Sequence, residues 1–247
     1  MIRTEEEIHA TLVNLILDES GSMDKVRMKT ISGLNEYIDT LKNFNGNVLF
    51  TLTKFHSDSL GESHIDVMYA AKEVKEISEI TKEVYKPSGG TPLYDAVGFT
   101  IRKMLKVWKK KIPVLCVIMT DGEENSSKEF TFEEVTKLIG ECEKKGWTFV
   151  YLGANQDAWA VGAQYGVASV NIRVFVPQQI NQTYDQLGIQ TITYLSNAQN
   201  YTSSHASVYT TSNFWNDSKT TAGNGLILPS IATTGHTKSK VTYTSKK

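Results

Sequence analysis

The stretch that decides the fold is TLVNLILDESGSM, residues 11–23, in which an apolar run ends at Asp18. A short run rich in Leu, Ile and Val is typical of a strand that is buried on both faces, as in a parallel sheet. After Asp18 the two serines Ser20 and Ser22 alternate with Glu19 and Gly21. Such a turn can direct one carboxylate and two hydroxyls at a single point. The stretch therefore predicts a buried strand that ends in a set of oxygen donors.

Outward from this stretch, segments with strand and helix patterns alternate. Strands are expected over residues 11–17, 47–55, 64–70, 113–120, 147–152 and 168–176. Helices are expected over residues 26–41, 92–108, 131–146, 157–165 and 177–195, whereas residues 71–86 fit a loop or a short helix equally. This alternation predicts an α/β fold: a Rossmann-like, doubly wound, mostly parallel six-stranded sheet with helices on both faces. A short turn with a glycine precedes residues 64–70, so this strand is expected to be the one antiparallel edge strand.

Composition excludes several classes of protein. The chain has 247 residues, of which 40% are hydrophobic and 21% charged, as in ordinary soluble domains. A net charge of −1 argues against a nucleic-acid partner. The longest apolar run, residues 114–119, is far shorter than the ~18 residues that a membrane span requires. With two cysteines and no apolar signal-peptide core, a cytoplasmic location is expected, or the virion if the chain is phage-encoded.

The charge is unevenly distributed along the chain. Residues 199–247 contain five lysines and one aspartate, a net charge of +4, which leaves −5 for residues 1–198. Of these 49 residues, 23 are Ser, Thr, Asn or Gln, and such sequence has few groups that can build a core. The expected organisation is one domain over residues 1–198, followed by a polar C-terminal tail over 199–247.

Two further segments bring oxygen donors to the same predicted edge of the sheet. Asp121 follows the most apolar strand, and Thr91 follows two glycines in GGTPLYDAV, residues 89–97. The carboxyl ends of parallel strands are where ligands bind in such sheets. Two carboxylates and three hydroxyls are hard donors, which suit Mg²⁺, with Mn²⁺ or Ca²⁺ as alternatives, better than Zn²⁺ or copper. An ion with so few anionic ligands would attract an external carboxylate.

The three motifs DESGSM, GGTPLYDAV and MTDGEEN, the last at residues 119–125, resemble the von Willebrand factor type A domain. The resemblance covers about residues 10–195, and YLGANQDA at 151–158 is similar to small cytosolic bacterial and phage members. It implies an intact metal-ion-dependent adhesion site. Its metal ligands would be Asp18, Ser20, Ser22, Thr91 and Asp121. No cofactor besides the metal is implied.

Ordinary structural roles are expected for the polar residues around these motifs. Glu19, Glu123 and Glu124 fit solvated loop positions. For Asn125 an ordinary loop position is favoured over the rim of the site, and for His56 the surface is favoured over a place near the metal.

Two other pairs have simple interpretations. Thr91 and Pro92 match an N-cap and first helical residue. Cys116 and Cys142 lie among apolar residues and fit small buried side chains rather than nucleophiles.

Three functions follow from these features. The first is a non-enzymatic, metal-dependent protein-binding module, whose ion accepts an Asp or Glu of a partner protein. The second is a structural or assembly protein, for example of a phage virion, with the tail as a connector that joins copies or other proteins. The third is a Mg²⁺-dependent phosphohydrolase with Asp18 as nucleophile. The third is disfavoured because position 20 is Ser, where the haloacid dehalogenase group places a second Asp as the general acid.

Overall fold

The computed structural model describes residues 10–108, 112–154, 162–163, 167, 171–200 and 213–215. Its six strands form one sheet in the order β3-β2-β1-β4-β5-β6. The strands are β1 (Ala10–Asp18), β2 (Asn47–Ser57), β3 (Ser63–Glu73), β4 (Val114–Thr120), β5 (Trp147–Gly153) and β6 (Ile172–Val174). All neighbouring strands are parallel except β3, which pairs antiparallel with β2 at the edge. The predicted α/β fold and its antiparallel edge strand are confirmed.

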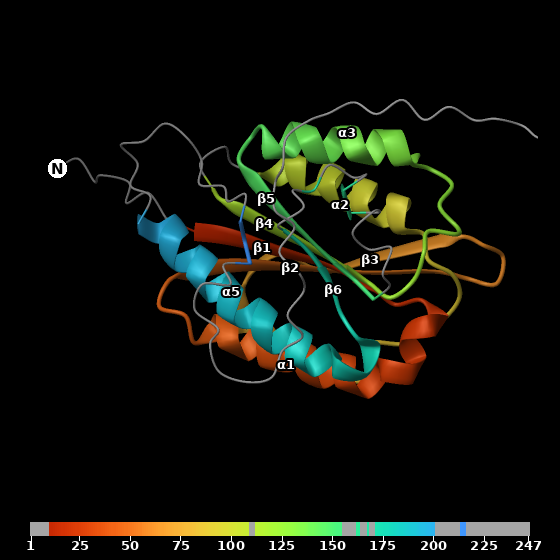
Figure 1. The fold of residues 1–247 in the computed structure, drawn as a ribbon, viewed down its shortest axis with the longest axis horizontal. Coiled ribbons are helices and arrows are strands. Elements are labelled where there is room, and N and C mark those ends of the chain that lie inside the picture. Colours follow the sequence, from red (N-terminus) through yellow and green to blue (C-terminus); the bar gives the residue numbers. More distant parts are fainter. Residues whose placement is uncertain are drawn as a thin grey trace, which may run out of the picture. The chain divides into compact units, whose positions relative to one another are not determined.

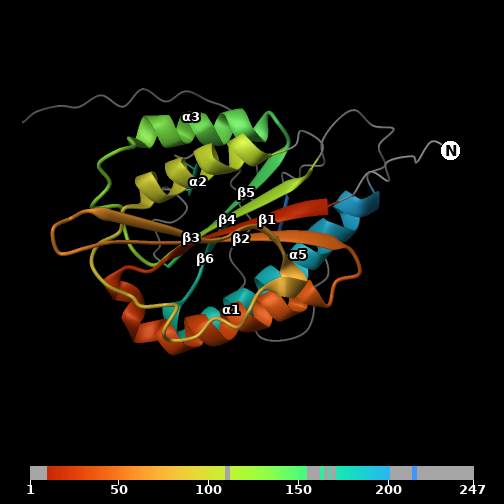
Figure 2. The same ribbon diagram turned by 180° about the vertical axis from the view of Figure 1, so that it is seen from behind.

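Helices pack on both faces of the sheet (Figure 1). The described residues include the α-helices α1 (Arg27–Lys42), α2 (Leu93–Val107), α3 (Phe132–Glu143) and α5 (Ile180–Asn200). They also include the short 3₁₀ turns η1 (Gly21–Val26), η2 (Val74–Glu76) and η4 (Pro177–Gln179). The view from behind shows that α1 and α5 cover one face and that α2 and α3 cover the other (Figure 2). In the same described part of the chain, no helix has the length and apolar character needed to cross a membrane.

The alternation of side chains along β1 explains why both faces need cover. Val13, Leu15 and Leu17 lie in the core beneath α1 and α5, whereas Leu12 and Ile16 lie in the core beneath α2 and α3. Every residue of β1 is buried. The central strand therefore sits inside two hydrophobic layers, as the apolar run in the sequence predicts.

Several predicted boundaries need correction. The helix expected from residue 26 begins as the 3₁₀ turn η1, and α1 proper starts at Arg27. β3 extends to Glu73, and the last strand is shorter than expected, at Ile172–Val174. The expected helix over 157–165 falls largely outside the described residues, as does the second half of 151–158. α3 begins with a capping box between Thr131 and Glu134, in agreement with the helix expected from residue 131.

The N-cap prediction at Thr91 is wrong. α2 starts at Leu93, its N-cap is Pro92, and the N-cap residue makes no side-chain capping hydrogen bond. The first-turn amides of Tyr94 and Asp95 donate instead to Glu124 Oε2 at 2.9 Å and to the Ser127 hydroxyl at 3.0 Å, so a neighbouring loop caps this helix.

The core also includes two residues beyond the predicted end of the domain. Phe214 and Trp215 are buried in the layer that contains α1 and α5. The amide of Phe214 donates 2.7 Å to Oδ1 of Asn171, and the Arg173 guanidinium stacks 4.3 Å from the centre of the Trp215 ring. The described part of the tail region therefore contributes to the packed core.

Candidate metal site

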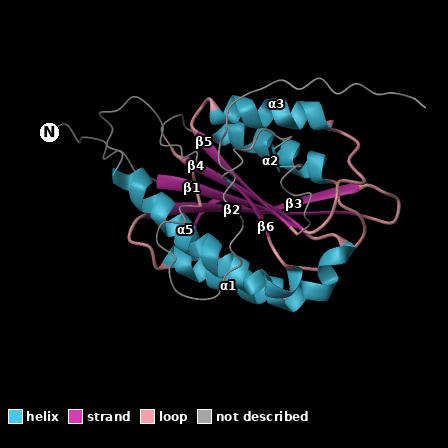
Figure 3. Cartoon of the chain, in the orientation of Figure 1, coloured by secondary structure: helices cyan, strands magenta, loops and turns pink. Residues whose placement is uncertain are grey.

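The candidate site lies where the chain turns off the carboxyl ends of two neighbouring strands, β1 and β4 (Figure 3). The chain leaves β1 for α1 on one face, and it leaves β4 for α3 on the other face. A sheet binds ligands at such a reversal of winding, because the diverging connections leave an open crevice there. Asp18 is the last residue of β1, and Asp121 directly follows β4.

The turn after β1 gathers its donors by short hydrogen bonds. The amide of Ser20 donates 2.7 Å to Oδ1 of Asp18, and the hydroxyls of Ser20 and Ser22 are 3.0 Å apart. The Ser22 hydroxyl in turn donates 2.5 Å to Oδ1 of Asp121. One continuous chain of contacts therefore connects four of the five predicted site residues.

The fifth residue, Thr91, reaches the same place through a close approach of glycines. The amide of Gly21 donates 3.0 Å to the carbonyl of Gly89, which brings the second loop against the first. A Cβ built on Gly122 would lie 3.0 Å from Oγ1 of Thr91 and 3.7 Å from Oγ of Ser22. Both hydroxyls therefore face the small space that the missing side chain of Gly122 leaves free.

Asn125 and Glu124 hold the loop of Thr91 in place. Asn125 accepts the Thr91 amide at Oδ1, and its own amide donates 3.2 Å to the Thr91 carbonyl. Glu124 is half-buried and accepts the amides of Tyr94, Ser126 and Ser127. The interpretation of Glu124 as a solvated residue is therefore wrong. Asn125 does lie beside the site, but as a backbone clamp on Thr91, which its position in the sequence did not indicate.

Burial shapes the electrostatics of the two aspartates. Burial raises the pKa of Asp18 to about 6, although the Thr120 hydroxyl, 2.6 Å from Oδ2, and Ser20 partly offset this effect. The negative charge of Asp121 raises it further. The pKa of Asp121 is also raised, chiefly by burial. Two carboxylates that are costly to ionise side by side are a suitable environment for a cation, which would stabilise both charges.

The donor set fits a hard divalent ion. Asp18, Ser20 and Thr91 are buried, whereas Ser22 is exposed and Asp121 is partly exposed, so the site opens to solvent on one side. Throughout the described ranges, no three His, Cys, Asp or Glu side chains gather in a way that could hold a metal. A set of three hydroxyls and two carboxylates is instead the oxygen chemistry that Mg²⁺, Mn²⁺ and Ca²⁺ accept.

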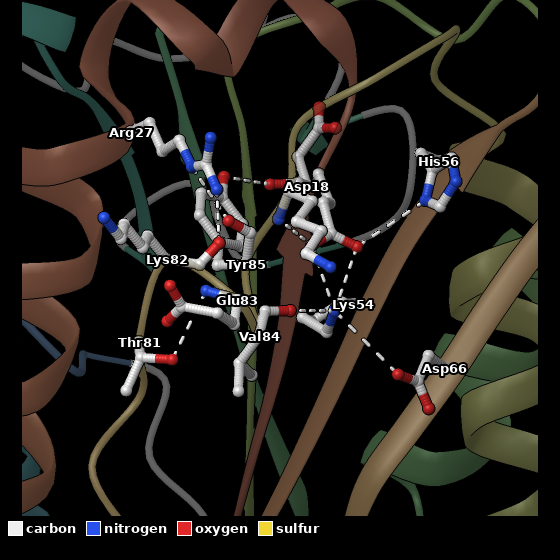
Figure 4. Close-up of polar contacts among 12 residues, drawn as sticks. Asp18, Arg27, Lys54, His56, Asp66, Thr81, Lys82, Glu83, Val84 and Tyr85 are labelled. Carbon is white, nitrogen blue, oxygen red and sulfur yellow. Dashed lines mark hydrogen bonds and ion pairs between the residues drawn. The ribbon is translucent and has the colours of Figure 1, made fainter.

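Glu19 is the clearest error of the sequence interpretation. It is buried rather than solvated, with 3% of its surface exposed, and its carboxylate receives Nζ of Lys54 at 3.0 and 3.1 Å. Nδ1 of His56, which is half-buried, lies 3.5 Å from Oε2 of the same carboxylate (Figure 4). A signal was available in the sequence: Lys54 stands inside a β-rich strand pattern, where a lysine needs a partner if it is buried.

The two cysteines match their predicted role. Cys116 and Cys142 are buried free thiols, and burial raises the pKa of the Cys116 thiol to about 12 and that of Cys142 to about 11. Such thiols are poor nucleophiles near neutral pH.

Comparison with known proteins identifies the family of the chain. The family model of the von Willebrand factor type A domain matches residues 13–186. None of the curated proteins compared with the chain matches it.

Solved structures share the fold. Proximal thread matrix protein 1 from the mussel byssus, in a structure with a zinc-occupied MIDAS motif, has a TM-score of 0.53 at 12% identity over 76% of this chain and 48% of its own. The pilus adhesin SpaC from Lactobacillus rhamnosus GG, in its open conformation, has a TM-score of 0.57 at 12% identity, and the match covers 76% of this chain and 30% of SpaC. A von Willebrand factor type A protein from Catenulispora acidiphila has a TM-score of 0.52 at 15% identity, and the match covers 74% of this chain and 42% of that protein. This chain spans about half or less of the length of these proteins, and the likeness concerns the fold alone.

Proposed function

This chain belongs to the von Willebrand factor type A family, and we propose that it is a divalent-metal-dependent protein-binding module without catalytic activity. Domains of this family are in general non-catalytic binding modules. The observation that carries the proposal is the convergence of Asp18, Ser20, Ser22, Thr91 and Asp121 at the open edge of β1 and β4.

The residues divide into two roles in this proposal. The hydroxyls of Ser20, Ser22 and Thr91 bind the metal directly, and Asp18 and Asp121 supply the negative charge that balances it. Mg²⁺, when bound, supplies a Lewis-acidic position that a Glu or Asp of a partner protein completes. Because the three direct ligands in this proposal are neutral hydroxyls and the two aspartates act from behind them, the ion would keep an electrophilic open position for a further carboxylate.

The test is affinity capture with the intact chain as bait, in Mg²⁺ and in EDTA. We expect partners that are retained in Mg²⁺ and released by EDTA, and we expect Asp18→Ala to lose them. The matched control is Asp24→Ala, because Asp24 is exposed and lies in the same turn, η1, without any contact to the predicted ligands among the hydrogen bonds of the described residues. Equal capture by Asp18→Ala in EDTA would show that the site is not what binds the partner.

The choice of ion is tested separately by titration calorimetry with Mg²⁺, Mn²⁺ and Ca²⁺. Binding that Asp18→Ala abolishes and Asp24→Ala leaves intact supports the site. A hydrolytic role predicts turnover of a generic phosphate ester that depends on Mg²⁺ and is lost in Asp18→Asn, and no such turnover is expected.

A further inference from the structure

The segment that delivers Thr91 to the site has no regular secondary structure over residues 80–88. Its backbone is held by side chains from other elements (Figure 4). Arg27 donates 3.0 Å from Nε to the Tyr85 carbonyl and also contacts the Lys82 carbonyl, and Lys54 donates 2.6 Å to the carbonyl of Val84. The position of Thr91 therefore depends on contacts made before the loop begins.

Asn35 adds an anchor at the start of this segment. Its side chain donates 2.9 Å to the Ile80 carbonyl and accepts the Ile80 amide at 2.8 Å. The beginning of the segment is thus fixed to α1, which leaves the end next to Gly89 to be fixed by other groups.

Glu19, which lies in the turn at residues 18–22, fixes the end of the segment next to Gly89. Its Oε1 accepts the Lys86 amide at 2.5 Å, and its carbonyl accepts the Ser88 amide at 2.9 Å. Its own amide donates 2.8 Å to the carbonyl of Phe55 in β2. Since Glu19 stands between Asp18 and Ser20, one residue connects both groups of predicted ligands to each other.

Lys54 completes this arrangement from β2. Its Nζ reaches both oxygens of Glu19 and the Val84 carbonyl, and its side chain is only 8% exposed. Asp66 lies at 3.8 Å, at the longer end of ion-pair distances. The Lys54 ammonium thus binds both the Glu19 carboxylate and the backbone of residues 80–88, which Glu19 also contacts.

We propose that Glu19, oriented by Lys54, is the positioning residue that sets the distance between the turn at residues 18–22 and the loop at residues 89–91. This proposal rests on the proposed metal-binding function. A buried ion pair is a poor source of stability, because removing two charges from water costs about as much as their attraction returns. We infer that the pair instead fixes the relative positions of the two loops. Mutation of residues that orient metal ligands commonly lowers metal affinity by ~10–100-fold.

The experiment separates geometry from stability with three variants of the full chain. Glu19→Gln keeps an oxygen for the Lys86 amide but removes the charge that Lys54 pairs with. Glu19→Met removes both contacts, and Glu19→Met combined with Lys54→Met also removes the unpaired buried ammonium. The control is Glu62→Met, because Glu62 also pairs with a lysine, Lys128 at 2.6 Å, but on the exposed surface.

Three measurements are made on each variant: Mg²⁺ affinity by calorimetry, the electron paramagnetic resonance spectrum of bound Mn²⁺, and the melting temperature. We expect Glu19→Met to bind Mg²⁺ at least about tenfold more weakly and Glu19→Gln to be intermediate. In the double variant the melting temperature recovers relative to Glu19→Met, but the affinity and the Mn²⁺ spectrum do not. The control is expected to match the wild type in all three.

Each outcome decides the matter. Wild-type affinity and an unchanged Mn²⁺ spectrum in the folded Glu19→Gln and double variants overturn the positioning role. A loss of affinity that follows the melting temperature, and that the double variant restores, assigns the pair to stability alone and also overturns it. Failure of the wild type itself to bind Mg²⁺ or Mn²⁺ rejects the metal site, and with it both proposals.

Discussion

The hydroxyl of Ser22 donates a 2.5 Å hydrogen bond to the carboxylate of Asp121, which joins the turn after β1 to the turn after β4. The two residues are 99 positions apart in the sequence. A hydroxyl and a carboxylate at this separation can both reach one small ion. This pair therefore offers the most direct test of the site.

Ser22→Ala is expected to weaken Mg²⁺ binding about tenfold or more and to leave the fold intact. The reason is that Ser22 is exposed and contributes a donor rather than core packing. Calorimetry gives the affinity, and circular dichroism checks the fold. Ser32→Ala is the control, because Ser32 is also an exposed serine but bonds only to Glu36 within α1 among the described hydrogen bonds. Equal Mg²⁺ affinity in the two variants would contradict a role for Ser22.

Mg²⁺ binding is expected to strengthen as pH rises from about 5 to 7. The pKa of Asp18 is raised from 3.8 to about 6, so below that pH a proton competes with the metal. In the absence of divalent ions, the contribution of Asp18 to the free energy of unfolding has the opposite pH dependence and falls as pH rises. The folded chain keeps the Asp18 proton between pH 3.8 and about 6 while the unfolded chain loses it, so this contribution to stability declines as pH rises through that window.

The measurement is the melting temperature of wild type and Asp18→Asn across pH 4–8, with Mg²⁺ and with EDTA. The stabilisation by Mg²⁺ should grow with pH in the wild type only. The wild type should also lose stability relative to Asp18→Asn as pH rises in EDTA. A Mg²⁺ effect that is equal at pH 5 and pH 7 would be incompatible with the raised pKa.

Gly89→Ala is expected to destabilise the fold and to displace Thr91. Gly89 has a φ of +61°, and a Cβ there would lie 1.5 Å from the carbonyl oxygen of Ser57. The left-handed backbone alone costs about 1–2 kcal/mol for a residue with a side chain. Urea unfolding measures the loss, which should exceed this value because of the overlap. Gly140→Ala is the control: a Cβ at Gly140 meets nothing within 4 Å, so this change within α3 should stabilise the chain by about 0.5–1 kcal/mol.

Phe214→Ala is expected to reduce the free energy of unfolding by about 3–5 kcal/mol, the usual cost of emptying a buried aromatic site. Only 3% of Phe214 is exposed, and its ring lies 5.0 Å from that of Trp215. Leu60→Ala serves as the control, because Leu60 is 81% exposed. If the two variants unfold at the same urea concentration, the burial of Phe214 does not stabilise the domain.

The sequence predicts the sheet well because its signal is local. The apolar runs that end at Asp18 and Asp121 identify β1 and β4, and the alternation of patterns predicts a parallel order with one reversed edge. Backbone hydrogen bonds and apolar burial decide these features, and both leave periodic traces in the sequence.

The contacts behind the site leave no such trace. Glu19 and Glu124 have the appearance of ordinary loop residues, yet each is held by groups far away in the sequence. Asp95 is a further case: its carboxylate is fully buried and accepts the amides of residues 128–130 and the hydroxyl of Ser63. Whether a polar side chain is solvated or clamped depends on which loop folds over it, and spacing along the chain does not encode that.

The scattering of the donors over three separate stretches has a consequence for how the protein assembles. A peptide that contains DESGSM alone, or a fragment that ends before β4, lacks Asp121 and with it one of the two carboxylates of the proposed site. The proposed site forms only when β1 has paired with β4, which is distant in the sequence, so we expect divalent-ion affinity only after these strands have paired. Ion binding would then report that the fold is complete, and a bound ion would in turn stabilise the folded chain against unfolding.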